Sequence, residues 1–284
     1  GNTILFGIRP QEKKVKMSKD TVPNVDVWHW KDEYIQSVQM RRAEQNKKFT
    51  FLCSIDLTTG QFSKLADEAL RQILISRNST YAIGRDEKPY INDVNWGVSP
   101  ADLYRINLKD GSRQLLAKEV KRPLGYSPDG RYYLYQLDSN LHVADLTTAK
   151  IVTVSAKAPV RFMNLEHPYP HEKPPFGLAG WTKDGKGVVV NHKYDLWLLA
   201  LDGSKATNLT AGLGTKEEIK FDYVSLDPLD EYIDTRKPIT LSAYGEWTKK
   251  SGFYSVLPGQ SPRPILFEDR DFGNPIKALH ADRI

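Results

Sequence analysis

The feature that most constrains the fold is a hairpin that the chain repeats. "TFLCSIDLTTGQFSKLA" from Thr50, "ADLYRINLKDGSRQLLA" from Ala101 and "YDLWLLALDGSKATNLT" from Tyr194 each hold an apolar run, a polar turn and a second run. The first run of every copy ends on a leucine, and these leucines recur roughly every 40 to 55 residues, at Leu57, Leu108, Leu146, Leu201 and Leu257. A recurring unit of that size with short strands is typical of a propeller or a solenoid.

Each unit contains more than the hairpin. Upstream of two copies lie "YSPDGRYYLYQL" and "GWTKDGKGVVVN", in which an Asp-Gly turn joins two β-rich runs. Tyr104, Ile106 and Leu108 alternate with other residues at period two, which favours strands over a helix. Four strands per unit predict an all-β fold, a β-propeller of four-stranded antiparallel blades.

We expect one propeller domain over residues 1–284, with about five blades that could be part of a larger ring. The first blade lacks an obvious innermost strand, and the final "NPIKALHADRI" could either begin a sixth blade or close the ring onto the first. The expected blades are 4–66, 70–117, 121–155, 176–210 and 221–268.

Composition excludes several classes of function. The formal net charge is +5, but acidic residues are interspersed among the basic ones, which argues against a nucleic-acid partner. The longest apolar stretches, such as 196–200, are far shorter than the roughly 20 residues of a membrane span. The single cysteine, Cys53, rules out an internal disulfide and metal sites built on cysteine clusters. Gly1 resembles a remnant of cleavage. The sequence does not determine the cellular compartment, although a periplasmic or secreted location is favoured. A homo-oligomer is also possible.

The long connections are predicted to gather at one end of the blades. Strands that run up and down place the second-to-third connections and the blade-to-blade links at the same end. Nearly all irregular sequence falls in that set, and long loops on a rigid scaffold are where binding usually occurs. We therefore expect an interaction surface formed by residues 9–48, 85–101, 156–176, 211–220 and 244–252.

The first long connection offers an aromatic anchor. "DVWHWKDEYIQSVQ" contains Trp28, His29 and Trp30, and the spacing of Trp30, Tyr34 and Val38 predicts a short helix with one packed face. These aromatic residues could bind a peptide or a neighbouring domain. They could equally pack on their own propeller. Trp96 and Trp247, in two other long connections, are further candidate binding residues.

Two charged motifs are weaker candidates. "EHPYPHE" contains His167 and His171 between two glutamates, yet its prolines forbid the helix on which metalloprotease spacing depends, so a stiff loop is favoured over a zinc site. Glu217 and Glu218 could hold a ligand's ammonium group, although an exposed pair of glutamates is common. No phosphate-binding or dinucleotide fingerprint is present, and we expect no cofactor and no metal. The nearest string to a nucleophile elbow, 259–263, lacks the closing glycine.

The chain resembles the N-terminal propeller of the prolyl oligopeptidase family of serine peptidases, in its dipeptidyl-peptidase-like branch. The resemblance rests on "DVWHWKDEYIQSVQ", "YSPDGRYYLYQL", "GLAGWTKDGKGVVVNHKYDLWLLALDG", "NLTAGLG" and "SAYGEWTKKSGFY". It implies a propeller without catalysis of its own, which restricts access to a separate α/β-hydrolase domain and helps to dock peptide substrates. Some relatives bind the substrate ammonium through paired glutamates, but the surroundings of Glu217 and Glu218 do not match that motif.

Two other interpretations remain open. The first is a free-standing propeller that resembles the TolB kind and binds a protein or peptide partner. The second, more distant, is an independent enzyme that uses His167 and His171 to hold a metal. The peptidase interpretation predicts an exposed apolar patch that contains Trp28 or Trp30.

Overall fold

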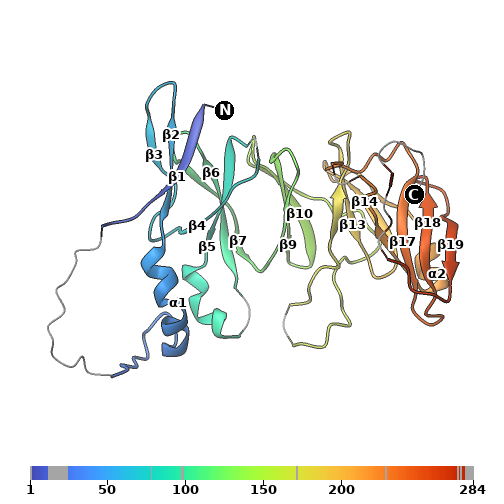
Figure 1. Ribbon diagram of the computed structural model, residues 1–284, viewed down its shortest axis with the longest axis horizontal. Helices are drawn as coiled ribbons and strands as arrows, with labels where there is room; N and C mark the ends of the chain where they lie inside the picture. The colour runs from blue at the N-terminus through green and yellow to red at the C-terminus, as the bar shows by residue number, and fades with distance from the viewer. Residues whose placement is uncertain are drawn as a thin grey trace. The chain divides into compact units, whose positions relative to one another are not determined.

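A computed structural model describes residues 2–11, 25–77, 79–96, 99–170, 172–227, 229–273, 275 and 277–278. The chain divides into two compact units, residues 1–121 and 122–284 (Figure 1). The fold is all-β, as predicted: one three-stranded and four four-stranded antiparallel sheets follow one another along the chain as blades of a β-propeller.

The first unit contains two blades. The first blade has the strand order β1-β2-β3, with β1 at Thr3–Ile8, β2 at Phe51–Asp56 and β3 at Phe62–Lys64. The second has the order β4-β5-β6-β7, with β4 at Gln72–Leu74, β5 at Tyr81–Asp86, β6 at Ala101–Asn107 and β7 at Arg113–Val120. Helix α1 (Gln36–Lys48) connects β1 to β2, and the 3-10 helix η1 (Lys88–Trp96) connects β5 to β6. Both helices lie at the end of these sheets opposite the β2–β3 turn (Figure 1).

The second unit contains three blades in sequence order. The third blade comprises β8 at Arg122–Tyr126, β9 at Tyr132–Leu137, β10 at Asn140–Asp145 and β11 at Lys150–Thr153. The fourth comprises β12 at Leu178–Trp181, β13 at Gly187–Asn191, β14 at Leu196–Ala200 and β15 at Ala206–Asn208. The fifth comprises β16 at Ile219–Tyr223, β17 at Ile239–Gly245, β18 at Ser251–Val256 and β19 at Arg263–Glu268. Helix α2 (Leu213–Glu217) lies in the link between the last two blades.

The repeated leucines mark one structural position. Each follows directly on the next-to-last strand of its blade, that is on β2, β6, β10, β14 or β18. The side chain just before the leucine explains why the pattern recurs, because it closes the following turn: Asp56 Oδ1 accepts the Thr58 amide at 2.8 Å and Asn107 Oδ1 accepts the Lys109 amide at 3.0 Å. In the fourth blade Ala200 occupies that place, and Asp202 takes over by accepting the Ser204 amide at 2.9 Å.

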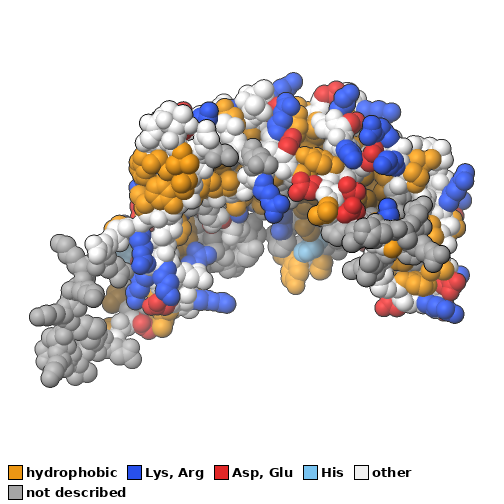
Figure 2. Space-filling model, turned by 45° about the horizontal axis from the view of Figure 1, so that its top comes forward, with side chains coloured by type: hydrophobic (Ala, Val, Ile, Leu, Met, Phe, Trp, Pro, Cys, Tyr) orange, Lys and Arg blue, Asp and Glu red, His pale blue; other side chains and the backbone are white. Residues whose placement is uncertain are grey.

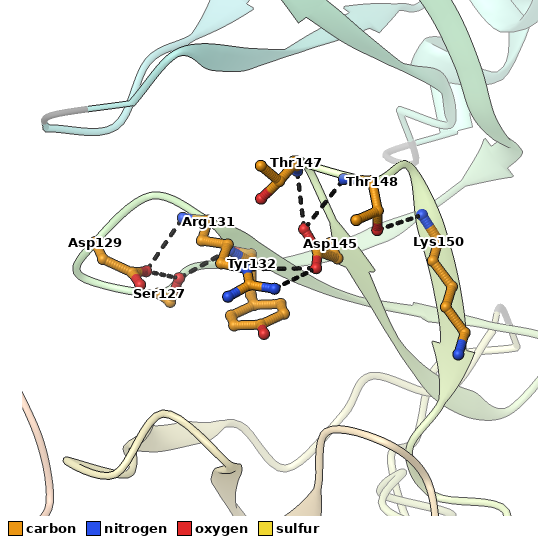
Figure 3. A network of polar contacts seen from close by, with 8 residues as sticks. All are labelled: Ser127, Asp129, Arg131, Tyr132, Asp145, Thr147, Thr148 and Lys150. Atoms are coloured by element: carbon orange, nitrogen blue, oxygen red, sulfur yellow. Dashed lines mark hydrogen bonds and ion pairs between the residues drawn. The ribbon is translucent and has the colours of Figure 1, made fainter.

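In the third blade, side chains of two neighbouring turns accept backbone amides and are joined by an ion pair (Figure 3). Asp145 accepts the backbone amide of Thr147 at 2.8 Å and pairs with Arg131 at 2.8 Å. Arg131 belongs to the neighbouring "SPDG" turn, where Asp129 accepts its amide at 3.1 Å and Ser127 accepts the amide of Tyr132 at 2.9 Å. The two turns therefore brace one another, and the repeated residues serve the scaffold.

Apolar side chains fill the space between successive blades of a unit. In the second unit, alternate residues of β13 point to opposite faces, so that Val188 and Val190 pack against the third blade and Val189 packs against the fifth. Ile233, from the connection between β16 and β17, completes this core: it is 2% exposed and exchanges backbone hydrogen bonds with Trp181 and Lys183. In the first unit a smaller core of Leu65, Leu70, Ala82, Ile106 and Leu108 lies between the two blades.

The expected helix around the tryptophans is displaced. Helix α1 begins at Gln36, so Trp30 and Tyr34 precede it and only Val38 is helical. None of its described side chains is fully buried. The four-residue spacing was therefore a poor guide here, because no packed apolar face forms along this helix.

Candidate functional site

Trp28 and Trp30 stand out from the first unit on a tight turn. Their side chains are 67% and 85% exposed. The turn is closed on both sides of His29: the His29 amide donates to Asp32 Oδ2 at 3.2 Å, and the Lys31 amide donates to His29 Nδ1 at 3.1 Å. His29 thus holds the turn, while Lys31 lies 4.9 Å from the centre of the Trp30 ring. Hydrogen bonds therefore fix the turn, while the two indoles stay uncovered within the described residues.

A cleft of about 330 Å³ adjoins this turn, between the end of α1, the start of β4 and η1. Arginines stack on its aromatic walls: the Arg42 guanidinium lies 4.5 Å from the Tyr34 ring and that of Arg71 lies 3.9 Å from the Phe49 ring. Basic and acidic side chains share its lining, namely Arg42, Arg71, Arg85, Lys88, Glu33, Glu68 and Glu87. This mixed lining suits a peptide surface that carries both charges better than a purely anionic ligand.

In the second unit, a polar network crosses the ends of the fourth and fifth blades. Lys193 pairs with Glu166 at 2.7 Å, from the connection between β11 and β12. The next residue, Tyr194, donates its hydroxyl to Glu246 Oε2 at 2.6 Å, and Lys220 lies 3.7 Å from the same carboxylate. The network therefore ties together three connections and the first strand of the last blade.

Hydrogen bonding fixes the charges of this network. The Tyr194 hydroxyl lowers the pKa of the Glu246 carboxyl, and Glu246 in turn raises the pKa of Tyr194. The hydrogen bond to Glu166 raises the pKa of Lys193 above its ordinary value. At neutral pH Lys193 and Glu246 are consequently ionised, beside a neutral Tyr194.

Asp195 anchors the link that carries Glu217 and Glu218. Its carboxylate is 1% exposed and accepts the amides of Gly214 and Thr215, each at 3.1 Å, and the Thr210 hydroxyl at 2.6 Å. These bonds hold helix α2 against the end of β14. No room exists for a side chain at Gly214, because a Cβ there would lie 2.4 Å from the Tyr194 carbonyl oxygen.

The structure scatters the residues predicted from the sequence. Glu217 and Glu218 are exposed at the end of α2, where Glu217 pairs with Lys216 at 3.1 Å, and Trp247 is 75% exposed. His167 is half-buried beside Tyr169, with 5.2 Å between the ring centres. His171 lies outside the described residues, and so does the side chain of Trp96, which ends η1.

Sequence analysis missed the polar network. Lys193, Tyr194 and Glu246 flank ordinary strands, and Glu246 lies 52 residues from Tyr194. Tyr194 and Glu246 belong to separate motifs that the sequence does not connect, so only the fold brings them together. The connection between β13 and β14 was short and therefore attracted no attention, although it provides Lys193, Tyr194 and Asp195.

Among the described residues, the exposed tryptophans, the mixed-charge cleft and the polar network are the candidates for a binding role. They contain no cluster of three His, Cys, Asp or Glu side chains able to hold a metal ion. None of the described helices has the length and apolar character needed to cross a bilayer. The first unit has exposed tryptophans and a mixed-charge cleft among its connections, and the second has paired ions. Such features are typical of protein and peptide recognition.

Acidification is expected to destabilise the second unit through His192. Burial beside Phe162 and Phe176 lowers the pKa of this imidazole below its ordinary 6.5. Below pH of about 6.5 the unfolded chain therefore takes up a proton that the folded chain still refuses, and the free energy of unfolding falls. Urea unfolding between pH 7 and pH 5 should show a smaller fall for His192→Gln than for the unmodified chain. An equal fall in both would contradict this assignment.

Comparison with known proteins finds similar chains among the solved structures. No family model matches the chain, and no curated protein matches it. Similar solved structures include TolB from Acinetobacter baumannii (12% identity, 76% of this chain and 48% of that chain, TM-score 0.36). They also include dipeptidyl peptidase 4 from Porphyromonas gingivalis (14%, 78% and 37%, TM-score 0.41) and oligogalacturonate lyase from Vibrio parahaemolyticus (12%, 77% and 59%, TM-score 0.37).

The chain spans less than two thirds of the length of each of these three proteins.

Proposed function

We propose that this chain is the non-catalytic propeller of a serine peptidase of the prolyl oligopeptidase family. In this role it docks an α/β-hydrolase domain through the loop ends of its blades and restricts the access of peptide substrates. The observation that carries the proposal is the exposure of Trp28 and Trp30, on the "DVWHWKD" segment that resembles this family. Indole rings held in water by a closed turn are costly unless a partner covers them.

The lack of a nucleophile elbow agrees with this role, because the resemblance implies that Ser, Asp and His belong to the hydrolase domain. The mixed-charge cleft beside Tyr34 would add polar contacts around the indoles. Peptide substrates would pass the polar network of Lys193, Tyr194 and Glu246, whose ionised groups can align charged peptide ends.

The coding sequence beyond Ile284 provides the first test. The proposal expects a Gly-x-Ser-x-Gly elbow, followed by Asp and then His, in the order of α/β-hydrolases. A reading frame that ends without these elements contradicts the proposal. It would leave a free-standing binding propeller, the TolB-like alternative.

The second test measures docking directly. When the propeller and the hydrolase domain are expressed separately, Trp28→Ala together with Trp30→Ala should weaken their association by about 100-fold or more, because each central tryptophan contributes about 2 kcal/mol to an interface. Isothermal titration calorimetry reports the change. The free propeller should unfold at an unchanged urea concentration, since both side chains are already exposed.

Leu57→Ala is the matched control. Leu57 is 59% exposed but lies at the β2–β3 turn, at the opposite end of the first blade. Its loss should leave docking unchanged. Equal weakening by both substitutions would place the interface elsewhere and overturn this use of the tryptophans.

A further inference from the structure

Polar side chains join the first two blades at the end where β2 turns into β3 and β6 turns into β7. Ser54 Oγ donates to the Leu108 carbonyl oxygen at 2.7 Å, and Ser63 Oγ donates to that of Lys109 at 2.7 Å. Arg113, just after that turn, donates to a backbone carbonyl oxygen of the first blade at 2.8 Å. These three contacts hold the β6–β7 turn against the first blade.

The third and fourth blades carry apolar residues at the same three places. Counted from the repeated leucines, Val143 and Val152 take the positions of the two serines, and they are likewise cross-strand partners. Ala206 takes the position of the arginine. Valine and alanine side chains have no hydrogen-bond donor. From these positions, therefore, no polar contact holds the β14–β15 turn against β10 and β11.

A groove of about 540 Å³ opens at this junction of the third and fourth blades. Its floor is the outer end of the core between the two blades, and Tyr132 stacks there on Trp181 with ring centres 6.1 Å apart. The floor is therefore part of a packed core rather than of a loop. Its apolar side chains are those of Tyr132, Val143, Val152 and Leu201.

Three lysines from different segments surround the groove. Lys150 begins β11, Lys186 lies in the β12–β13 turn and Lys205 in the β14–β15 turn. All three are exposed, and none forms an ion pair with a carboxylate among the residues that the structure describes. Lys150 extends away from Asp145 (Figure 3). In the space-filling view, Lys and Arg side chains gather over the upper part of the second unit, with Asp and Glu among them (Figure 2).

The two aspartates of the lining already have partners. Asp145 pairs with Arg131 at 2.8 Å, and Asp202 accepts the Ser204 amide at 2.9 Å. Hydrogen bonds from Ser204 and, to a smaller extent, the Lys150 ammonium lower the pKa of Asp202, so this carboxyl is ionised at neutral pH. The three lysines and Arg131 give four positive charges against two negative ones, which leaves an excess of two positive charges.

This combination of an apolar floor and a basic rim favours an acidic peptide. Small-molecule sites fix their ligands with polar groups inside a cavity, whereas the lysines here are exposed on the rim. A nucleic-acid backbone would meet the two aspartates. The chain's own segments outside the described residues do not complement the groove: 12–24 holds four lysines against two acidic residues, and 279–284 holds one aspartate and one arginine.

We propose that the groove between the third and fourth blades binds an acidic peptide segment of a partner protein, in which apolar side chains alternate with Asp or Glu. The apolar side chains of the peptide lie on Val152 and Leu201, and its carboxylates pair with the three lysines. The groove lies at the turns β12–β13 and β14–β15, whereas the polar network of Lys193 lies at the opposite end of the same strands. The site is therefore independent of the proposed peptidase role.

Fluorescence anisotropy with the full chain tests the ligand class. The probe is fluorescein-labelled Glu-Glu-Leu-Glu-Phe-Glu-Glu, which should bind saturably with a dissociation constant below about 1 mM in about 50 mM salt and more weakly in about 500 mM salt. Two control peptides, Glu-Glu-Ser-Glu-Ser-Glu-Glu and Lys-Lys-Leu-Lys-Phe-Lys-Lys, should each bind about tenfold more weakly or worse. No saturable binding of the probe, equal binding of either control, or tighter binding of an oligothymidylate would overturn the proposal.

Charge reversal locates the site on the chain. Lys150→Glu, Lys186→Glu and Lys205→Glu, combined, should weaken binding of the probe by about tenfold or more, because three attractive pairs become repulsive. All three side chains are exposed, so the midpoint of urea unfolding should change little.

The matched control reverses three other exposed lysines of the second unit, none of which lines the groove. This control combines Lys157→Glu, Lys183→Glu and Lys237→Glu. It changes the net charge of the chain by the same amount and should leave binding nearly unchanged. Equal weakening by both triple variants would reveal a general attraction between charges and refute the groove as the site.

Lysine acetylation followed by mass spectrometry tests whether the groove is free. Lys150, Lys186 and Lys205 should react readily in the chain alone and more slowly when the probe is bound. Lys183 should react at the same rate in both samples. Protection of the three groove lysines in the chain alone would mean that the chain itself covers the groove, and the partner peptide would be refuted.

Discussion

Replacement of Phe221 by alanine is expected to lower the free energy of unfolding of the second unit by about 3–5 kcal/mol. Phe221 lies on β16, is 2% exposed and meets Tyr254 edge to face, with ring centres 5.1 Å apart. It belongs to the core between the fourth and fifth blades, together with Val189, Leu196 and Leu241. Removal of its ring leaves a cavity, and the surrounding strands cannot close it because their backbone hydrogen bonds fix them in place. The free energy of unfolding therefore falls both by the lost transfer free energy of the ring and by the cost of the cavity.

Urea unfolding followed by circular dichroism measures the effect. Phe221→Leu is the control, because it keeps most of the volume and should cost less than half as much. A loss below about 1 kcal/mol for Phe221→Ala would mean that the fifth blade is not packed on the fourth as described.

The fold class was predictable because its signals are local. Asp56, Asn107 and Asp145 close turns within a few residues of themselves, and the alternation in β6 requires no distant partner to be recognised. These signals repeat with every blade. The missing strand of the first blade was visible for the same reason, since a repeat reveals what one copy lacks.

The candidate site was less predictable because its contacts are distant. Tyr194 and Glu246 belong to different blades, and nothing in their neighbourhoods marks them as partners. Trp28 and Trp30 were singled out because they lie in a long connection and aromatic side chains dominate binding contacts. Their exposure was not decided by the sequence, which allowed them to pack on their own blade; the structure leaves them uncovered within the described residues.

The prediction of a helix around Trp30 was wrong for a related reason. A four-residue spacing indicates a packed helical face only if that face meets a core. Here Asp32 accepts the His29 amide and forms a turn, and the helix starts four residues after Asp32. A local hydrogen bond between side chain and backbone thus prevailed over the apolar spacing.

Asp195→Ala is expected to cost about 3 kcal/mol of stability and to loosen the link that carries Glu217 and Glu218. Asp195 is buried and accepts two backbone amides, from Gly214 and Thr215, in addition to threonine hydroxyls. Alanine leaves these two amides without their protein acceptor at a position that is 1% exposed. Helix α2 has five residues and cannot hold itself without this anchor.

Asp195→Asn tests how much of the effect comes from the charge of the carboxylate and how much from the space that the side chain fills. Asparagine fills the same space and keeps one carbonyl oxygen for Gly214 and Thr210, but it turns an amide group toward the Thr215 N–H, so about half of the loss should remain. Hydrogen exchange at Thr215 and Lys216 should accelerate in the alanine variant more than exchange in the cores of β13 and β14. Tyr194 directly precedes Asp195, and its hydroxyl lowers the pKa of Glu246. Asp195→Ala should therefore weaken this hydrogen bond and raise the pKa of Glu246. Unchanged exchange at Thr215 would show that α2 is held by packing rather than by the carboxylate.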